Sequence, residues 1–391
     1  MRSFRFVRER GEPAGPRRLG CRPAPATRRA YPTGRRFALL SRKFVVMPRH
    51  PITDFLRTAA GPILDVRAPA EYAQGHIPGA LSLPLFTDEE RARIGTTYKQ
   101  VNPEKAVLLG LDFFGPKMRT MVEQARKLAP GQEVRLHCWR GGMRSGAVQW
   151  LLELGGLQVN LLDKGYKDYR HWALAEMARP RQLRVLGGYT GSGKTAVLHA
   201  LAAQGEPVLD LEGLANHLGS SFGALGQPPQ PTQEQFENDL AAALAALPPD
   251  QPIWVEDESR NIGSLTIPTP LFSQMQAAPL VVLDVPQAAR VQYLASSYGR
   301  QDAAGLAAAV LRLSKRLGGL VTKEALGAIA DGDMARMVEL VLAYYDKTYG
   351  YGLEGRPSVT VAAEGTDAAA NAALVRAAAD QPEFLVNHSA S

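Results

Sequence analysis

Cysteine and long apolar runs are both scarce in this sequence. Its two cysteines, Cys21 and Cys138, are too few and too far apart for a disulfide framework or a metal cluster, so we expect a reducing compartment, the cytoplasm. No apolar run reaches the roughly 18 residues of a transmembrane helix, which predicts a soluble protein without a membrane partner. The 391 residues, 45% of them hydrophobic, suffice for two or three globular domains.

Acidic residues are nearly absent from the first 46 positions. Residues 1–46 hold 13 lysines and arginines against two glutamates, a local net charge of +11, whereas the whole chain carries +7. Residues 47–391 therefore have a net charge of −4, so the overall basic charge gives no argument that the folded part binds nucleic acid. Because it lacks hydrophobic periodicity, this basic head is predicted to be disordered.

Three explanations account for the basic head. It could be an RNA-binding arm, or an Arg-rich, acid-poor organelle presequence. The explanation we favour is a start codon assigned too early, because Met47 directly precedes the first patterned segment. We therefore expect residues 1–46 to be dispensable.

Short apolar strands alternate with helical stretches from Pro51 to about Trp172. The expected strands read PILDV, ALSLPL, VRLHC and VNLLD, with one helix around 117–129 and another reading SGAVQWLLEL. Alternation of this kind predicts an α/β domain in which helices cover a parallel sheet. The pattern breaks at Ala178–Gln182, so we assign residues 50–177 to a first domain.

A second α/β pattern begins directly after this break. Its expected strands read LRVLGG, PVLDL, PIWVEDE and PLVVLDV, with helices from Lys194 and over 234–247. The crossovers are long enough for helices, which favours a doubly wound sheet. After Pro286 a helical part runs to about Tyr349, and SVTVAA adds a last strand. The second domain is thus predicted over 182–364, followed by a tail at 365–391.

A reactive thiol is predicted at Cys138, which ends an apolar strand shortly before a helix that starts near Ser145. The loop between them holds two glycines that let backbone N–H groups turn toward the sulfur, and two arginines that add positive potential: Gly141, Gly142, Arg140 and Arg144. The helix N-terminus adds to that potential. Such surroundings favour the thiolate form and an anion bound above the sulfur.

Two other interpretations of the same loop stay open on its residues alone. Cys138 could be a small buried hydrophobe at a strand end. The spacing C-x5-R, from Cys138 to Arg144, also matches the phosphate loop of cysteine phosphatases. The loop therefore does not separate sulfur transfer from phosphate hydrolysis.

An upstream segment resembles the rhodanese family. Residues 63–85, ILDVRAPAEYAQGHIPGALSLPL, closely resemble the opening motif of that family. The resemblance implies that Asp65 and Arg67 hold the end of the sheet and its loops together, and that GHIPGA is a structural turn. It also implies a rhodanese-like first domain in which Cys138 carries a transferable chalcogen.

A phosphate-binding loop opens the second domain. Residues 188–195, GYTGSGKT, match G-x-x-x-x-G-K-[ST] between an expected strand and an apolar helix. In such a loop glycines let the backbone wrap a phosphate, the lysine reaches across it, and the threonine could ligate Mg²⁺ if a metal is used. The residues concerned are Gly188, Gly191, Ser192, Gly193, Lys194 and Thr195. The alternative is a Gly-rich turn without a ligand.

Acids expected beside this loop follow two other strands. Glu256 and Asp257 end an apolar strand, where a P-loop fold carries its metal-binding or water-orienting acid, and Asp210 is a second candidate. Arg260 could pair with these acids or with a bound phosphate. For each acid a solvated carboxylate at a strand end is an equally good interpretation.

The two modules together resemble one family, bacterial tRNA 2-selenouridine synthase, throughout residues 50–353. The matching segments are TTYKQVNPEKAVLLGL, CWRGGMRS, GGYTGSGKT, DLEGLANHLGSSFG, VEDESRNIG and YYDKTYGYG. The resemblance implies that the wobble uridine of certain tRNAs is modified, with selenium from selenophosphate replacing the sulfur of 2-thiouridine. It also implies S-geranylation of that sulfur by geranyl diphosphate, which we interpret as the preceding step.

The resemblance also assigns substrates and partners. No tightly bound cofactor is implied; selenophosphate and geranyl diphosphate are substrates, and Mg²⁺ is an optional ion. The partners are tRNA, through its anticodon region, and an enzyme that produces selenophosphate. The loop at 210–223 could accept the isoprenoid or the tRNA, or be only a connector. Candidate tRNA contacts are Arg312, Lys315, Arg316, Lys323, Tyr344, Tyr345, Lys347 and Tyr349, which a helix face explains equally well.

Two rival functions belong to other classes. One is a plain sulfurtransferase or thiol phosphatase attached to a P-loop scaffold without catalytic activity. The other is a nucleotide-driven regulatory module in which Cys138 acts only as a sensor. The number of matching segments favours the tRNA-modifying enzyme over both.

Overall fold

The computed structural model describes residues 49–57, 60–353 and 358–381, with side chains 348–353 left out. The described residues all belong to one unit by their contacts, Met47–Ser391. The predictions for the basic head, residues 1–46, lie outside the described residues, and so does the Tyr349 side chain. None of the helices described is both long and apolar enough to cross a bilayer.

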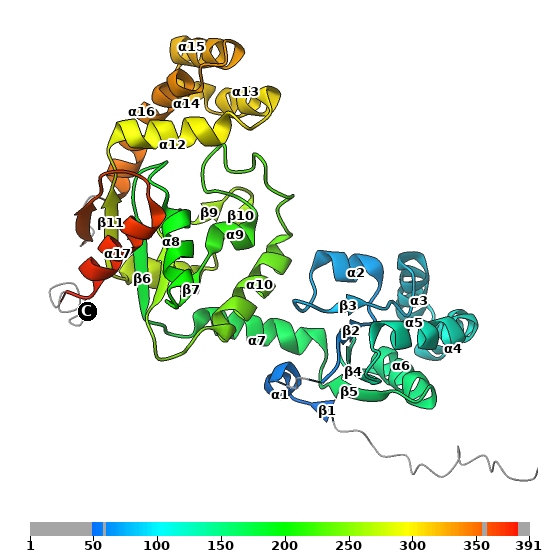
Figure 1. Cartoon of the computed structure of the whole chain (residues 1–391). Coiled ribbons are helices and arrows are strands. Elements are labelled where there is room, and N and C mark those ends of the chain that lie inside the picture. The colour runs from blue at the N-terminus through cyan, green and yellow to red at the C-terminus, as the bar shows by residue number, and fades with distance from the viewer. Residues whose placement is uncertain (1–48, 58–59, 354–357, 382–391) are drawn as a thin grey trace, which may run out of the picture. The chain divides into compact units, whose positions relative to one another are not determined.

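Five parallel strands form the sheet of the first domain, in the order β1-β5-β4-β2-β3 (Figure 1). The strands are β1 (Arg49–His50), β2 (Ile63–Asp65), β3 (Leu81–Ser82), β4 (Glu133–His137) and β5 (Gln158–Leu162). The helices are α1 (Ile52–Arg57), α2 (Pro69–Gln74), α3 (Asp88–Gln100), α4 (Pro103–Phe114), α5 (Met118–Leu128), α6 (Met143–Leu154) and α7 (Tyr166–Ala178), with a 3₁₀ turn at Gly115–Lys117. The predicted parallel sheet with covering helices is confirmed.

Local signals explain where several of these helices begin. The Thr87 hydroxyl accepts a hydrogen bond from the backbone N–H of Glu90, whose side chain accepts one from Thr87, which makes a capping box for α3. Asn102 caps α4, and Pro103 occupies its first turn. The segment ALSLPL contributes only two residues to β3, although the N–H groups of Leu83 and Leu85 still donate to the carbonyls of Asp65 and Val66. Pro84, which lies between them, has no N–H to donate.

The second domain has its own five-stranded parallel sheet, in the order β12-β11-β6-β8-β7 (Figure 1). Its strands are β6 (Leu183–Gly187), β7 (Val208–Leu209), β8 (Ile253–Glu256), β11 (Leu280–Asp284) and β12 (Ser358–Ala362), beside an antiparallel pair, β9 (Asn261–Ile262) and β10 (Leu265–Thr266). Its first helices are α8 (Lys194–Ala203), α9 (Leu211–Ala215), α10 (Gln233–Ala246) and α11 (Thr269–Ala277). β6 lies at the centre, so the loop after it leaves the sheet from its middle.

A helical part follows β11, as predicted. It consists of α12 (Gln287–Tyr298), α13 (Ala303–Arg312), α14 (Ser314–Leu317), α15 (Gly319–Ala330) and α16 (Met334–Leu353). These helices share a core of their own, and Phe222, from the loop after α9, inserts into it. The loop at 210–223 is thereby tied to the helical part.

The prediction of a tail from residue 365 onward needs correction. Residues Ala368–Ala379 form α17, which Asp367 caps by accepting a hydrogen bond from the N–H of Ala370. Ala372 and Val375 are fully buried and share a core with Val197 and Leu201 of α8. The Ala-rich composition hid this helix, because its buried face consists largely of small residues that make a weak hydrophobic pattern.

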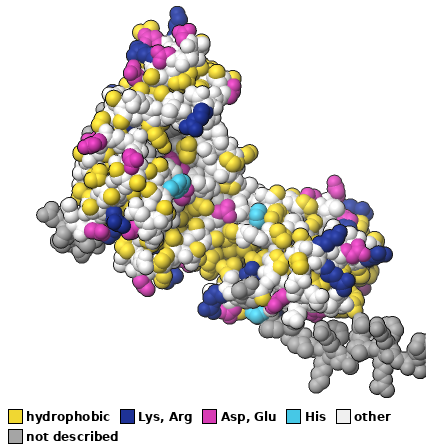
Figure 2. Space-filling view, in the orientation of Figure 1, with side chains coloured by type: hydrophobic (Ala, Val, Ile, Leu, Met, Phe, Trp, Pro, Cys, Tyr) yellow, Lys and Arg dark blue, Asp and Glu magenta, His cyan; other side chains and the backbone are white. Residues whose placement is uncertain are grey.

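Charges of both signs mix on the face of the molecule that Figure 2 shows. Lysine and arginine side chains alternate there with aspartate and glutamate over the helices of the first domain. This agrees with the net charge of −4 counted for residues 47–391. Contacts to tRNA phosphates therefore have to come from local groups of residues.

Candidate functional site

The thiol of Cys138 lies at the end of the central strand β4 and is 2% exposed. Its Sγ donates a hydrogen bond to Oγ of Ser145 at 3.1 Å, and that hydroxyl donates to the carbonyl of Gly142 at 3.2 Å. Helix α6 begins at Met143, two residues before the predicted start. The sulfur thus contacts the first turn of a helix, where backbone N–H groups lack helical partners.

The loop around the sulfur offers its backbone to an anion. In the described part of the chain, the N–H groups of residues 140–144 donate to no protein acceptor. Gly141 adopts a φ of +64°, and a Cβ there would lie 2.8 Å from the backbone nitrogen of Lys164. Both features fit the predicted nest for a persulfide-like or oxyanion group.

The two loop arginines behave differently. Arg144 pairs with Glu71 of α2 through two hydrogen bonds of 2.7 and 3.3 Å. Burial raises the pKa of Glu71, but the hydrogen bond and charge of Arg144 outweigh it and leave that pKa below its usual value. Arg140 is exposed. Arg144 is therefore partly neutralised, and Arg140 is the arginine more open to an incoming anion.

A buried ion pair supports the end of the sheet beneath this loop. Arg67 and Asp65 are 1% and 0% exposed and are joined by hydrogen bonds of 2.6 to 3.0 Å. Arg67 also donates to the carbonyl of Gly75, in the GHIPGA turn, at 2.6 Å. His137, fully buried, lies 3.8 Å from the Asp65 carboxylate. These contacts are those of a scaffold, the role that the resemblance implied for Asp65 and Arg67.

The phosphate loop runs from β6 to α8. Gly188, Gly191 and Gly193 have φ values of +149°, +84° and +78°, a region that residues with a side chain rarely adopt. Lys194 Nζ donates to the carbonyl of Gly188 at 2.8 Å and so reaches back across the loop. The Oγ of Ser192 is buried and finds no partner among the described residues. The local geometry is that of an anion site at a helix N-terminus.

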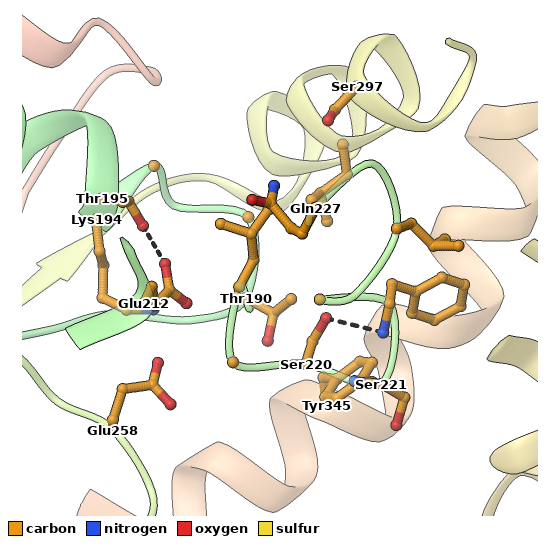
Figure 3. Close-up of a pocket in the computed structure, with 18 of the residues that line it drawn as sticks. Thr190, Lys194, Thr195, Glu212, Ser220, Ser221, Gln227, Glu258, Ser297 and Tyr345 are labelled. Atoms are coloured by element: carbon orange, nitrogen blue, oxygen red, sulfur yellow. Dashed lines mark hydrogen bonds between the residues drawn. The ribbon is translucent and has the colours of Figure 1, made fainter. Parts of the chain in front are cut away.

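The phosphate loop opens into a cavity of about 910 Å³. Three acids line it, Glu212, Asp257 and Glu258. Thr195 Oγ1 donates a hydrogen bond to Glu212, and Figure 3 shows both beside Lys194. Glu258 lies on the same side, because a Cβ on Gly219 would meet carboxylate oxygens of Glu258 and Glu212 at 2.6 and 2.9 Å. Two carboxyl groups thus converge next to the phosphate loop.

This convergence changes the protonation of Glu258. Burial first, and then the neighbouring Glu212 carboxylate, raise the pKa of Glu258 to about 8, although Lys194 opposes the shift. Two carboxylates so close cannot both ionise at little cost. At neutral pH the pair therefore holds a proton between its members.

The side chains predicted from the sequence to lie beside the phosphate loop are found in different places. Asp257 lines the cavity, but Asp210, Glu256 and Arg260 do not. Asp210 caps α9 and accepts a hydrogen bond from His199 at 2.8 Å. Glu256 is fully buried and accepts one from the N–H of Leu211 at 3.1 Å, while Arg260 donates to the Thr269 hydroxyl.

Sequence reasoning missed Glu212 and Glu258 by one or two positions. Helix α9 begins directly after Asp210, whose carboxylate caps the helix. Glu212, the second residue of α9, therefore faces the phosphate loop. Glu256 still belongs to β8 and points into the interior, where burial and Asp210 raise its pKa well above the usual value. Glu258 follows once the chain has left the strand.

Part of the remaining lining is apolar and aromatic, beside polar residues such as Ser220, Gln227 and Arg316. This part is formed by Leu218, Phe222, Leu225, Phe272, Tyr293, Leu294, Tyr298, Tyr344 and Tyr345. Phe222 stacks on Tyr298 with ring centroids 5.1 Å apart. The Tyr345 hydroxyl accepts a hydrogen bond from the N–H of Ser221 at 3.0 Å, and Figure 3 shows the two residues close together. The cavity thus brings an anion site together with a set of apolar and aromatic side chains, which we call the aromatic compartment.

One buried arginine ties the helical part to the phosphate loop. Arg290 of α12 donates to the carbonyl of Thr190 at 3.2 Å and forms two hydrogen bonds of 2.7 and 2.8 Å with Asp346 of α16. Its guanidinium lies 5.1 Å from the ring centroid of Tyr189. No motif marked Arg290 in the sequence, because its partners are distant along the chain.

The candidate tRNA contacts divide into two groups. Arg316, Tyr344 and Tyr345 line the cavity, and Arg312 donates to the carbonyl of Ser221 at 2.8 Å. The remaining lysines, Lys315, Lys323 and Lys347, are exposed. Tyr344 and Tyr345 therefore face the same cavity as the phosphate loop.

Oxygen donors suited to Mg²⁺ lie at the phosphate loop. Magnesium prefers carboxylate, hydroxyl and phosphate oxygens, which Thr195 and Glu212 supply side by side. Among the described residues, no group of three or more His, Cys, Asp or Glu side chains is arranged to hold a metal.

The fold and the two loops define a class, a rhodanese-like domain followed by a P-loop domain. A rhodanese-like family model matches residues 53–171, and the model of the tRNA 2-selenouridine synthase AAA domain matches residues 181–380. The chain belongs to the tRNA 2-selenouridine synthase family. This confirms the resemblance seen in the sequence and the α/β fold class.

Several curated relatives carry that family name. A tRNA 2-selenouridine synthase from Marinobacter nauticus is 37% identical over 329 residues, 75% of this chain and 88% of the relative. One from Bdellovibrio bacteriovorus is 35% identical over 353 residues, 78% and 92% of the two chains. The match to the Nitrosomonas europaea protein is 39% identical and spans 61% of this chain and 63% of the relative, just under two thirds.

Proposed function

We propose that this protein is a transferase that converts 2-thiouridine to 2-selenouridine at the wobble position of tRNA. Selenophosphate supplies the selenium, and geranyl diphosphate first alkylates the sulfur. The relatives named above support the overall reaction. The observation that carries the two-step scheme is the cavity, which joins a phosphate loop to an aromatic compartment in a chain that also holds a thiol loop.

Geranyl diphosphate matches both parts of this cavity, the phosphate loop and the aromatic compartment. Its diphosphate would bind the N–H groups of the phosphate loop and Lys194, while its isoprenoid chain would pack against Tyr293 and Leu294. The thiocarbonyl sulfur attacks the allylic carbon, the carbon–oxygen bond breaks, and diphosphate leaves with the bonding pair. Thr195 and Glu212 would hold a Mg²⁺ ion, which would offset the charge of the leaving diphosphate.

Alkylation prepares the second step. A thioether sulfur leaves C2 of the base more readily than a thiocarbonyl sulfur does. The selenium of selenophosphate, already at the selenide level, can therefore attack C2; the C–S bond breaks, geranyl thiolate leaves with the bonding pair, and water cleaves the P–Se bond to release phosphate. Cys138 is the group to which we assign selenium delivery, because its loop offers free N–H groups to an anion. The exposed Arg140 would add attraction for selenophosphate.

The tRNA is the macromolecular partner, recognised through its anticodon region. Its wobble base has to reach the cavity, and Tyr344 and Tyr345 offer rings on which the base could stack. Arg316, at the same cavity, and the exposed Lys315 and Lys323 would contact phosphates. A selenophosphate-producing enzyme would supply the second substrate.

Nucleoside mass spectrometry tests this function. The full chain is incubated with tRNA that contains 2-thiouridine, with both donors or with either one omitted. We expect geranylthiouridine when only geranyl diphosphate is present, and selenouridine when both are present. Unchanged tRNA with both donors, in an assay where a verified member of the family converts it, would overturn the proposal in favour of a plain sulfurtransferase.

A further inference from the structure

We infer that helix α10 of the P-loop domain positions the thiol loop of the rhodanese-like domain, with Glu234 and Asn238 acting through Tyr166 as positioning residues for Cys138. The thiol site then depends on the second domain for its geometry. The inference rests on the proposed function only where selenium transfer is the measured quantity.

The turn at Gly165–Lys167 holds the backbone of the thiol loop. The N–H of Tyr166 donates to the carbonyl of Cys138 at 2.8 Å, and the N–H of Lys167 donates to the carbonyl of Trp139 at 2.9 Å. Gly165 has a φ of +64°, and a Cβ there would clash with the Cys138 carbonyl oxygen. The position of Cys138 is therefore set by where this turn sits.

The side chain of Tyr166 connects the turn to α10. Its hydroxyl donates to Glu234 Oε1 at 2.8 Å and accepts a hydrogen bond from Asn238 Nδ2 at 2.7 Å. Burial above all raises the pKa of Tyr166, and Glu234 adds to this, so the hydroxyl keeps its proton as a donor. Both Tyr166 and Asn238 are fully buried, which makes loss of either bond costly.

Asn238 uses its whole side chain at this contact. Besides Tyr166, its Nδ2 donates to the carbonyl of His76 at 2.9 Å, and its Oδ1 accepts from Arg170 at 2.6 Å. Gln235 accepts a hydrogen bond from the N–H of His76 at 2.9 Å. The first turns of α10 thus form hydrogen bonds with two segments of the rhodanese-like domain, the GHIPGA turn and α7.

Aromatic packing transmits the position of Tyr166 to the thiol loop. The Tyr166 ring lies 5.8 Å from Trp139 and 6.1 Å from His137, the residues on either side of Cys138. The Arg67 guanidinium covers the same ring at 3.7 Å from its centroid. A rotation of this ring would displace both neighbours of the thiol.

A pair of tyrosine variants in the full chain tests the inference. Tyr166→Phe removes the hydroxyl that binds α10 next to the thiol loop. Tyr169→Phe is the matched control, because its hydroxyl donates to the backbone carbonyl of Asn238 at 3.1 Å from the same helix but does not hold the loop. Glu234→Ala removes the acceptor of the Tyr166 hydroxyl from the other side of the contact. Glu234→Gln keeps an acceptor oxygen and is the conservative variant.

The first readout is the rate at which iodoacetamide alkylates Cys138, followed by peptide mass spectrometry that separates it from Cys21. We expect Tyr166→Phe and Glu234→Ala to raise this rate about fivefold, the factor that corresponds to one hydrogen bond of typical net strength. Tyr169→Phe and Glu234→Gln should stay near the wild-type rate. Equal rates in all five proteins, or an equal rise in both tyrosine variants, would overturn the inference.

The second readout separates the two chemical steps. Tyr166→Phe should lower selenouridine formation about fivefold while leaving geranylation at the wild-type rate, because the phosphate cavity is untouched. An equal loss of both steps would indicate general destabilisation and contradict a positioning role. If wild type forms neither product, the proposed function fails, whereas the alkylation rates still decide the inference.

Discussion

The thiol loop and the phosphate loop share one local plan and differ in what surrounds them. Each follows the central strand of a five-stranded parallel sheet and precedes a helix. The thiol loop closes over a cysteine that is 2% exposed, whereas the phosphate loop opens into a cavity of about 910 Å³. The same backbone plan is therefore found in two different surroundings, which residues from elsewhere in the chain provide.

The two loops also differ in where their support comes from. The phosphate loop is surrounded by its own domain, through Glu212, Glu258 and Arg290. The thiol loop rests on a turn whose tyrosine is held by a helix of the other domain. Variants that damage one loop and spare the other therefore test this comparison directly.

The largest effect is expected for Lys194→Ala. Removal of the ammonium group should lower geranylation at least about 100-fold, since a charged contact to the leaving diphosphate is lost. Calorimetry with inorganic diphosphate should show correspondingly weaker binding. The alkylation rate of Cys138 should stay unchanged, and a change in that rate would contradict the independence of the two loops.

Two neighbouring acids should separate catalysis from stability. Glu212→Ala should lower geranylation about 10- to 100-fold, because Thr195 and a bound cation lose their carboxylate partner. Asp210→Ala removes the cap of α9 and should lower stability by about 1 kcal/mol. Steady-state rates and thermal melts of both variants provide the check. A larger rate loss in Asp210→Ala would favour Asp210, the second candidate acid from the sequence.

The aromatic compartment should affect the binding of geranyl diphosphate and not that of inorganic diphosphate. Tyr293→Ala should raise the KM for geranyl diphosphate about tenfold, because Tyr293 lines the cavity with a ring that is 37% exposed and would lose its contact with the isoprenoid chain. Binding of inorganic diphosphate, which lacks the isoprenoid, is the control and should not change. Equal weakening of both ligands would show that the substitution disturbs the phosphate loop instead.

The smallest effect is a pH dependence from Glu258. Folded Glu258 keeps its proton up to about pH 8, whereas the unfolded carboxyl loses it near its usual pKa of 4.5. Folding therefore binds a proton between these values, and the free energy of unfolding falls as pH rises through this window. Glu258→Gln lacks this pH-dependent contribution to the free energy of unfolding. Its melting temperature relative to wild type should therefore rise from about pH 5 to pH 8, and the difference should be constant above about pH 8. A constant difference across these melts would contradict the raised pKa.

Sequence reasoning predicted local geometry best where that geometry depends on neighbouring residues. The Cys138 loop and the GYTGSGKT loop each combine a strand end, glycines and a helix start within about ten residues, so local rules describe them. The same rules predicted both parallel sheets and the strand at 358–363, observed as β12 over Ser358–Ala362.

Sequence reasoning was less successful where function depends on distant residues or on helix phase. Asp210 caps α9 and Glu256 is buried at the end of β8, whereas Glu212 and Glu258 lie beside the phosphate loop. Arg290 and Asn238 gain their roles only through partners far along the chain. Such roles require the folded arrangement.

The most direct test of the central claim, that two loops perform two successive steps, is a comparison of Cys138→Ala with Lys194→Ala on the same 2-thiouridine tRNA with both donors present. Nucleoside mass spectrometry should find geranylthiouridine accumulating with Cys138→Ala and neither product with Lys194→Ala. Selenouridine formed at the wild-type rate by Cys138→Ala, or by Lys194→Ala without a geranylated intermediate, would contradict the account.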